Sequence, residues 1–445
     1  MRGWCIRRDS EWRVSGIVCE LGGAVKRVTL VLLMLFSFAV PWEYSLDLGE
    51  PLGNIARVLG VLLLLTVVPL VLLKKGMRAP GLVQWLVLGL YLYFACSYFW
   101  TVDPEATLEK MRSYFQVMML AWIVWEVADT PQQLNGLMRA FVAGCWVLAL
   151  LTAMNFASAS AVAAQQIRFV AEGQDPNDVA RFLDLGFPLA TLLFATESQR
   201  LVRALAIGYV PVGLMAVLLT ASRGGFSGAL TALLGSAILL VVWRPRGASM
   251  VFVGLAVTTV ALWLFVPLES LDRLATIPEQ VAAGDLNDRL SLWRAGFHAF
   301  TQAPWWGYGA GTFSIAAGLA PTDTAHNTVM AVLVTGGLVG TTIFLAIVVA
   351  VGWAVVRTNG LLRIALGTAL GVWIITSMVG SVEENRTTWL LFGIMALAGR
   401  LAQEKPFLMA RVFSGIDGSG TSGQQTAPQA MTVRGIAGGV RVHGQ

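Results

Sequence analysis

Charged side chains are scarce in this chain. Of its 445 residues only 13% are Asp, Glu, Lys or Arg, whereas 56% are hydrophobic. Soluble globular domains carry about 25% charged residues, and disordered chains carry few hydrophobic ones. The composition therefore excludes both classes for most of the chain and predicts an integral membrane protein.

Cysteine is also rare, and the spacing of Cys5, Cys19, Cys96 and Cys145 indicates neither a disulfide framework nor a zinc site. The sequence also lacks an HExxH motif, a cysteine–histidine ligand cluster, a P-loop and a GxSxG motif. The sequence therefore lacks the motifs that zinc proteolysis, ATP-driven transport and serine hydrolysis require. We expect no metal and no cofactor, which leaves a reaction in which arginines hold an anionic group.

The net charge of +5 does not indicate nucleic-acid binding, because the basic residues lie in short clusters between apolar runs rather than along one stripe. About twelve apolar runs are long enough to cross a bilayer, at 28–41, 55–73, 82–100, 114–127, 134–156, 179–196, 202–220, 226–243, 250–267, 338–356, 361–379 and 388–401. We therefore predict an all-α, polytopic membrane fold.

The basic clusters predict the orientation of these spans. If the N-terminus is cytoplasmic, the clusters at 26–27, 74–78, 200–203, 244–246, 357–363 and 400–405 all lie inside, as the positive-inside rule requires. The predicted organisation is a cytoplasmic extension (1–27), a membrane domain (28–404) and a disordered cytoplasmic tail (405–445) rich in Gly, Ser, Thr and Gln. The first apolar run resembles a signal peptide with a small-residue site near Ala39, but Pro41 and Trp42 favour an uncleaved anchor.

One long polar loop, at about 268–337, lies on the side opposite the basic clusters. Leu290, Trp293, Phe297 and Phe300 recur at helical spacing before Pro304, which predicts an amphipathic helix against the membrane surface.

A second helix is expected after the sequence TDTAHN in the same loop. Thr322, Asp323 or Thr324 is its candidate N-cap, and Gly336 and Gly337 are expected to end it before the next span.

His326 is the candidate catalytic residue of this loop. A helix N-terminus and nearby arginines should lower its pKa and leave a neutral imidazole that accepts a proton at pH 7, which is the state a general base needs. The alternative is a polar residue that only begins a helix.

Arg223 lies just past the outer end of a span, where its charge opposes the positive-inside bias. A phosphate or carboxylate partner and simple snorkelling of the side chain are both open. Arg289 and Arg294 in the long loop add further donors, although nearby aspartates could neutralise some of them.

Two charged groups in other outer segments are secondary candidates. Arg181 and Asp184 lie one helical turn apart, so an ion pair between them is favoured over a proton relay. Glu383 belongs to a small charged turn with Glu384 and Arg386, which could simply orient the last hairpin.

Four motifs follow one another along the chain: SYFWTVDPEATLEK at 97–110, TASRGGF at 220–226, DRLSLWRAGF with PWWGYGAGTF at 288–313, and AHNTVMAVLVTGGLVG at 325–340. In this order they resemble the O-antigen ligase and polymerase superfamily of bacterial envelope enzymes.

The resemblance implies a GT-C-like glycosyltransferase of the bacterial inner membrane that takes a glycan from undecaprenyl pyrophosphate at the periplasmic face. It implies that His326 is the base on the acceptor hydroxyl and that Arg223 and Arg289 hold the pyrophosphate. Arg294, Arg181 and Glu383 are kept as secondary candidates from their positions in the sequence. The resemblance also implies inversion at the anomeric carbon, and a reaction that needs no metal or nucleotide.

The acceptor distinguishes the branches of that superfamily. Lipid A core oligosaccharide makes the protein a ligase, a growing lipid-linked glycan makes it a polymerase, and a protein hydroxyl makes it an oligosaccharyltransferase. We expect the ligase, with the polymerase as the first alternative. A secondary transporter is the alternative of another class, but it is expected to show repeated halves and ionisable groups near the bilayer midplane.

Overall fold

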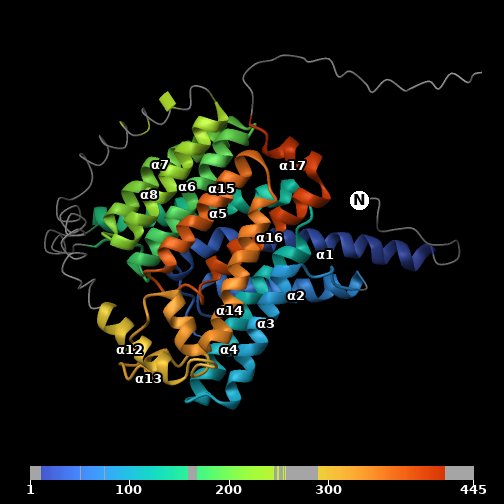
Figure 1. Cartoon of the computed structure of the whole chain (residues 1–445). Coiled ribbons are helices and arrows are strands. Elements are labelled where there is room, and N and C mark those ends of the chain that lie inside the picture. The colour runs from blue at the N-terminus through green and yellow to red at the C-terminus, as the bar shows by residue number, and fades with distance from the viewer. Residues whose placement is uncertain are drawn as a thin grey trace, which may run out of the picture. The chain divides into compact units, whose positions relative to one another are not determined.

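The computed structural model describes residues 12–50, 52–74, 76–158, 168–244, 248–249, 254, 256 and 289–415. Its helices, with η for a 3₁₀-helix, are α1 (Trp12–Ala39), η1 (Val40–Ser45), α2 (Ile55–Leu73), α3 (Leu82–Cys96), η2 (Ser97–Phe99), α4 (Pro104–Val127), α5 (Pro131–Ser158), α6 (Pro176–Thr196), α7 (Arg200–Leu219), α8 (Arg223–Trp243), α12 (Arg289–Gln302), α13 (Phe313–Ala316), α14 (Thr328–Val356), α15 (Gly360–Ser377), α16 (Arg386–Glu404) and α17 (Pro406–Phe413). No β-strand occurs within these residues, so the all-α prediction is confirmed (Figure 1).

Nine of the described helices are long and apolar enough to cross a membrane: α1 with η1, α2, α3 with η2, α5, α6, α7, α8, α14 and α15. The chain is therefore a multi-pass membrane protein. Two further predicted spans fall on α4 and α16, which are 24 and 19 residues long but less apolar. The remaining predicted span, at 250–267, lies outside the described residues apart from two positions.

Helices α6 and α16 lie at the centre of the bundle. Residues 387–401 of α16 are all buried, and 89% of the apolar window of α6 is buried. Helix α6 packs against α5, α7, α8 and α15, while α16 packs against α4 and α14. A helix surrounded by other helices does not contact lipid, so it can carry polar residues on the sides that face its neighbours. This explains why the sequence of α16 is less apolar than that of the other predicted spans.

Helix α14 is broken at Gly337, whose φ of +61° and ψ of −163° are reserved for glycine. Four backbone hydrogen bonds from the loop 304–309 satisfy the groups that the break frees: Tyr308 N to Val334 O (3.1 Å), Gly309 N to Thr335 O (2.9 Å), Leu338 N to Pro304 O (2.8 Å) and Val339 N to Trp305 O (3.2 Å). The expected helix end at the glycine pair is confirmed, and the glycine-rich loop is its partner.

The amphipathic helix predicted before Pro304 is α12, and it packs on α13 and the first part of α14. Gly296 and Ala299 are its buried positions, whereas Phe297 is 55% exposed. The helix is therefore confirmed. Its small residues Gly296 and Ala299 face the protein, while the exposed Phe297 leaves an apolar side chain for the predicted contact with the membrane surface, which stays a prediction.

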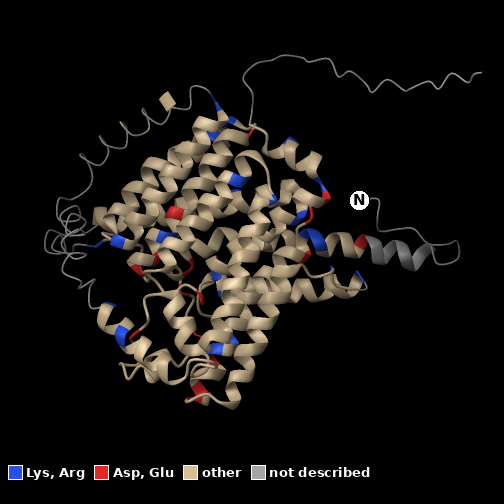
Figure 2. Cartoon of the chain, in the orientation of Figure 1, with Lys and Arg blue, Asp and Glu red and all other residues tan. Residues whose placement is uncertain are grey.

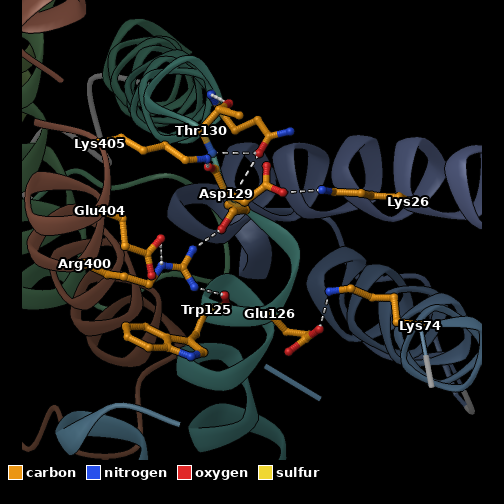
Figure 3. Close-up of polar contacts among 11 residues, drawn as sticks. Lys26, Lys74, Trp125, Glu126, Asp129, Thr130, Arg400, Glu404 and Lys405 are labelled. Carbon is orange, nitrogen blue, oxygen red and sulfur yellow. Dashed lines mark hydrogen bonds and ion pairs between the residues drawn. The ribbon is translucent and has the colours of Figure 1, made fainter. Parts of the chain in front are cut away.

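Basic residues from distant parts of the sequence gather where α17 lies, which we call the α17 end (Figures 2 and 3). The contacts there are Lys26 Nζ to Asp129 (2.5 Å), Lys74 Nζ to Glu126 (2.6 Å), Lys405 Nζ to Asp129 O (2.5 Å), and Arg400 to Trp125 O and Ala128 O (2.8 and 2.5 Å). The predicted topology places these four cations on one side of the membrane, and the structure brings them together. The side itself remains a prediction.

Helix α17 differs from the predicted tail. The tail was expected to be disordered from residue 405, but Pro406–Phe413 is helical. Proline at the first helical position and an apolar pair at Met409 and Phe413, four residues apart, give a helix with one buried face. That face packs on α5, α15 and α16. Residues 416–445 lie outside the described part of the chain.

Candidate functional site

His326 lies in an unusual backbone conformation just before α14. Its φ is +44°, in the left-handed region that a residue with a Cβ enters at a cost of about 1–2 kcal/mol. Asn327 caps the helix, because its Oδ1 accepts from Met330 N at 3.0 Å. The prediction of Thr322, Asp323 or Thr324 as the cap is therefore wrong, since Asp323 turns back and accepts from Ala320 N instead.

The surroundings of His326 keep its imidazole neutral. Partial burial lowers the pKa of His326 and the charge of Arg289 lowers it further, whereas the nearby carboxylates Asp175, Asp323 and Asp178 oppose this shift. A neutral imidazole near pH 7 can accept a proton. The electrostatic prediction for His326 is confirmed in direction.

Arg289 lies near both Arg223 and His326. Burial lowers the pKa of Arg289, Asp175 raises it, and the charge of Arg223 lowers it again, while the charge of Arg289 acts in turn on His326. Arg289 is the first residue of α12 and Arg223 the first of α8. Two arginines near each other at a half-buried place can bind an anion, and Asp175 is the carboxylate that opposes their charge.

The start of α8 gives this place additional positive potential. Ser222 caps the helix, with its Oγ accepting from Gly225 N at 3.1 Å. The positive end of the helix dipole therefore lies at Arg223.

The family comparison covers this place in the chain. Residues 208–345 match the family model described as O-antigen ligase. This stretch of the chain is similar to an O-antigen ligase domain, and we call it the O-antigen ligase domain below. The matched residues include Arg223, Arg289 and His326, and they confirm the family predicted from the motifs. No curated protein sequence matches the chain.

Arg168 adjoins the O-antigen ligase domain and was not among the predicted residues. Its Nε donates to Thr220 O at 3.1 Å and its Nη2 to Asn177 Oδ1 at 3.4 Å, while Ser222 Oγ bonds the same Asn177 oxygen at 2.7 Å. Arg168 thus lies against the turn that leads into Arg223. A basic residue on the side opposite the basic clusters was the signal that singled out Arg223, and the same signal applies to Arg168.

Arg181 lies outside the O-antigen ligase domain and pairs differently from the prediction. Its guanidinium makes an ion pair with Asp178 at 2.8 Å, so the predicted pair with Asp184 is wrong. Asp178 is three residues before Arg181 and Asp184 three after it, and both spacings allow contact. Asp184 is fully buried, and neither carboxylate oxygen has a hydrogen-bond partner among the described residues.

Glu383 lies in the turn between α15 and α16, which is bonded to the start of α14. Three hydrogen bonds join the two segments: Asn327 Nδ2 to Met378 O (3.1 Å), Thr328 Oγ to Gly380 O (2.9 Å) and Val382 N to Thr328 Oγ (2.9 Å). Burial and the neighbouring Glu384 raise the pKa of Glu383 to about 8, against the opposing effects of Lys110 and Thr328. The structure therefore places Glu383 behind the His326 turn rather than with the arginines.

Arg294 and a cavity at residues 302–307 are separate features from the arginine–histidine cluster. Arg294 is exposed on α12. The cavity, of about 610 Å³, is lined by Trp100 and residues 302–307, and it includes none of the predicted site residues. We therefore build the site of the O-antigen ligase domain on the side chains of Arg223, Arg289 and His326.

Proposed function

We propose that this protein is an O-antigen ligase that transfers a glycan from undecaprenyl pyrophosphate to lipid A core oligosaccharide. The proposal is carried by Arg289, which lies near both Arg223 and His326, the three residues coming from separate elements of the matched stretch. The reaction needs a base for the acceptor hydroxyl and cations for the diphosphate that leaves, and these are the groups present.

The proposed reaction assigns one step to each group. His326 accepts the proton of the acceptor hydroxyl as its oxygen attacks the anomeric carbon of the lipid-linked sugar. The bond from that carbon to the diphosphate oxygen breaks, and its electron pair leaves with the diphosphate. Arg223 and Arg289 stabilise the growing negative charge with forked, charge-assisted hydrogen bonds. Arg168 supports the turn before Arg223, while Arg181 and Glu383 act through neighbouring segments.

The proposal includes the orientation of the protein in the bacterial inner membrane. The α17 end, where four of the predicted cytoplasmic cations gather, faces the cytoplasm, and α12 and the start of α14 face the periplasm. Reporter fusions after position 75 should be cytoplasmic, and fusions within 289–302 should be periplasmic. A cytoplasmic α12 would contradict the mechanism, since the lipid-linked glycan would lie on the other face.

The acceptor is tested by reconstitution in lipid nanodiscs with undecaprenyl-pyrophosphate-linked glycan. We expect transfer to lipid A core oligosaccharide and no lengthening of the donor glycan, both measured by gel. Arg411→Ala is the matched control for arginine variants, because Arg411 is exposed at the α17 end. Lengthening of the lipid-linked glycan without transfer to lipid A core would identify a polymerase instead. Transfer should persist in excess EDTA.

A further inference from the structure

The peptide between Ala325 and His326 is tied to α12 by a tryptophan. Trp293 Nε1 donates to Ala325 O at 2.9 Å. Ala325 itself is 1% exposed and packs in the small core formed with Ala299, Phe313 and Val334. The carbonyl immediately before the left-handed residue is therefore fixed by an indole from another helix.

The other side of His326 is fixed by α14 and the turn after α15. Asn327 caps α14 and donates to Met378 O, and Thr328 is bonded to Gly380 and Val382. A left-handed histidine persists only where its surroundings hold it. The indole of Trp293 supplies that constraint on the α12 side.

Trp293 shares its helix with Arg289. The two residues are four positions apart on α12, so they lie one turn apart on the same face. One rigid helix thus carries a cation of the anion site and the group that fixes the candidate base.

We propose that Trp293 is a positioning residue, which sets the place of the His326 imidazole beside Arg289 by holding the Ala325 carbonyl. The expected effect on kcat rests on the proposed function. The expected effect on the position of the His326 imidazole does not. The bond ties base and cation to one helix, so their separation does not depend on the mobility of the loop between them.

The pKa of His326 should depend on where its imidazole lies relative to Arg289. The charged groups that face it are Arg289 from α12, Asp175 and Asp178 from α6, and Asp323 from its own loop. Release of the turn would expose the imidazole and move it from Arg289, so its pKa should rise toward the ordinary 6.5. A base acts in its neutral form, and a higher pKa therefore moves the acid limb of the rate profile to higher pH.

The first variant is Trp293→Phe, which keeps an aromatic ring and removes the N–H donor. We expect kcat to fall about tenfold to a hundredfold, as for a small misplacement of a reacting group. The KM for the donor should change little, because both arginines remain. Trp146→Phe is the matched control, since Trp146 Nε1 donates to Leu205 O at 3.0 Å between α5 and α7. That control should keep the kcat and the pH profile of the unchanged protein.

A second variant removes the donor without changing the shape. Benzothienylalanine incorporated at position 293 replaces the indole N–H by sulfur and keeps the bicyclic ring, so insertion and packing are preserved. It should reproduce the effects of Trp293→Phe on kcat and on the acid limb.

The decisive measurement does not require activity. The chain has three histidines, so the ¹³C-labelled imidazole of His326 can be titrated by NMR in nanodiscs and assigned by its loss in His326→Ala. A higher pKa of His326 in both position-293 variants, but not in Trp146→Phe, supports the positioning role. The same pKa and acid limb as in the unchanged protein would overturn it, whatever happens to kcat. If the protein transfers no glycan at all, the proposed function fails while this titration still decides the inference.

Discussion

The charged side chains at the α17 end are arranged differently from those near the start of α12. At the α17 end, Lys26 pairs with Asp129 and Lys74 with Glu126 (Figure 3). Burial alone would raise the pKa of Asp129, but the hydrogen bond and charge of Lys26, with Lys405 and Arg78, hold it below its usual range. In these pairs opposite charges compensate one another, as in a structural ion-pair network, although the like charges of Arg400 and Arg78 also interact there.

Near the start of α12 two cations lie near each other, and the carboxylate of Asp175 opposes part of their effect. Arg289 lies beside Arg223, and the charge of Arg223 adds to burial in lowering the pKa of Arg289. His326 is held at a positive φ. Strain and like-charge contacts persist where a ligand or a reaction compensates them, which is why they collect at functional sites. We therefore expect substitutions near the start of α12 to change catalysis and substitutions at the α17 end to change stability.

The strongest test of this comparison is His326→Ala. Removal of a general base slows a reaction by about a hundred- to ten-thousand-fold, so glycan transfer in nanodiscs should fall by that factor. Donor affinity should change little, because the arginines remain, and titration of donor binding measures this directly. Transfer within a few-fold of the unchanged protein would remove His326 from the mechanism.

The next largest effect is expected for Arg289→Ala and Arg223→Ala. A hydrogen bond to a charged group contributes about 1.5–3 kcal/mol, or roughly ten- to a hundredfold in transfer for each arginine. Lysine should restore the activity poorly at either position, since an ammonium cannot form the fork that a diphosphate accepts. Both rates are compared with that of Arg411→Ala. Near-normal transfer in both alanine variants would contradict the diphosphate site.

The sequence predicted the periodic and chemically marked parts of the fold well. Apolar runs mark the spans, helical spacing marks α12, and the glycine pair marks the break in α14. Arg223 was found because a cation on that side opposes the topology rule. These features depend only on neighbouring residues or on the membrane. They can therefore be predicted from one sequence without knowledge of the tertiary contacts.

Features set by contacts between distant segments were missed or wrong. Arg181 had carboxylates three residues away on both sides, and only its packing in three dimensions selects Asp178 over Asp184. The left-handed φ of His326 depends on Trp293 and on the turn after α15, which are distant in sequence. Arg168 carried the required signal but lay in a segment without a recognised motif.

The α17 end should respond in stability rather than in catalysis. Glu126 is 4% exposed and accepts from Lys74 and from Arg78 N. Glu126→Gln removes the charge that pairs with Lys74, and a hydrogen bond to a charged group contributes about 1.5–3 kcal/mol. We expect a lower melting temperature in detergent and an unchanged kcat for the folded fraction. Arg289→Ala should show the reverse, a lost kcat and an equal or higher melting temperature. Equal losses of stability in both variants would remove the distinction between the two ends.

The smallest expected effect concerns Glu383, whose pKa is raised from 4.5 to about 8, chiefly by burial. The folded protein binds this proton more tightly than the unfolded chain, so its contribution to stability is complete below about pH 4.5 and is lost as the pH rises to about 8. Glu383→Gln imitates the protonated carboxyl, and it should therefore change transfer little at pH 7. Above pH 8 the variant should melt at a higher temperature than the unchanged protein. Melting curves from pH 5 to pH 9 measure the difference, which should grow with pH. If Glu383→Gln instead abolishes transfer at pH 7, the carboxylate itself takes part in the reaction, and the functional region extends behind the His326 turn.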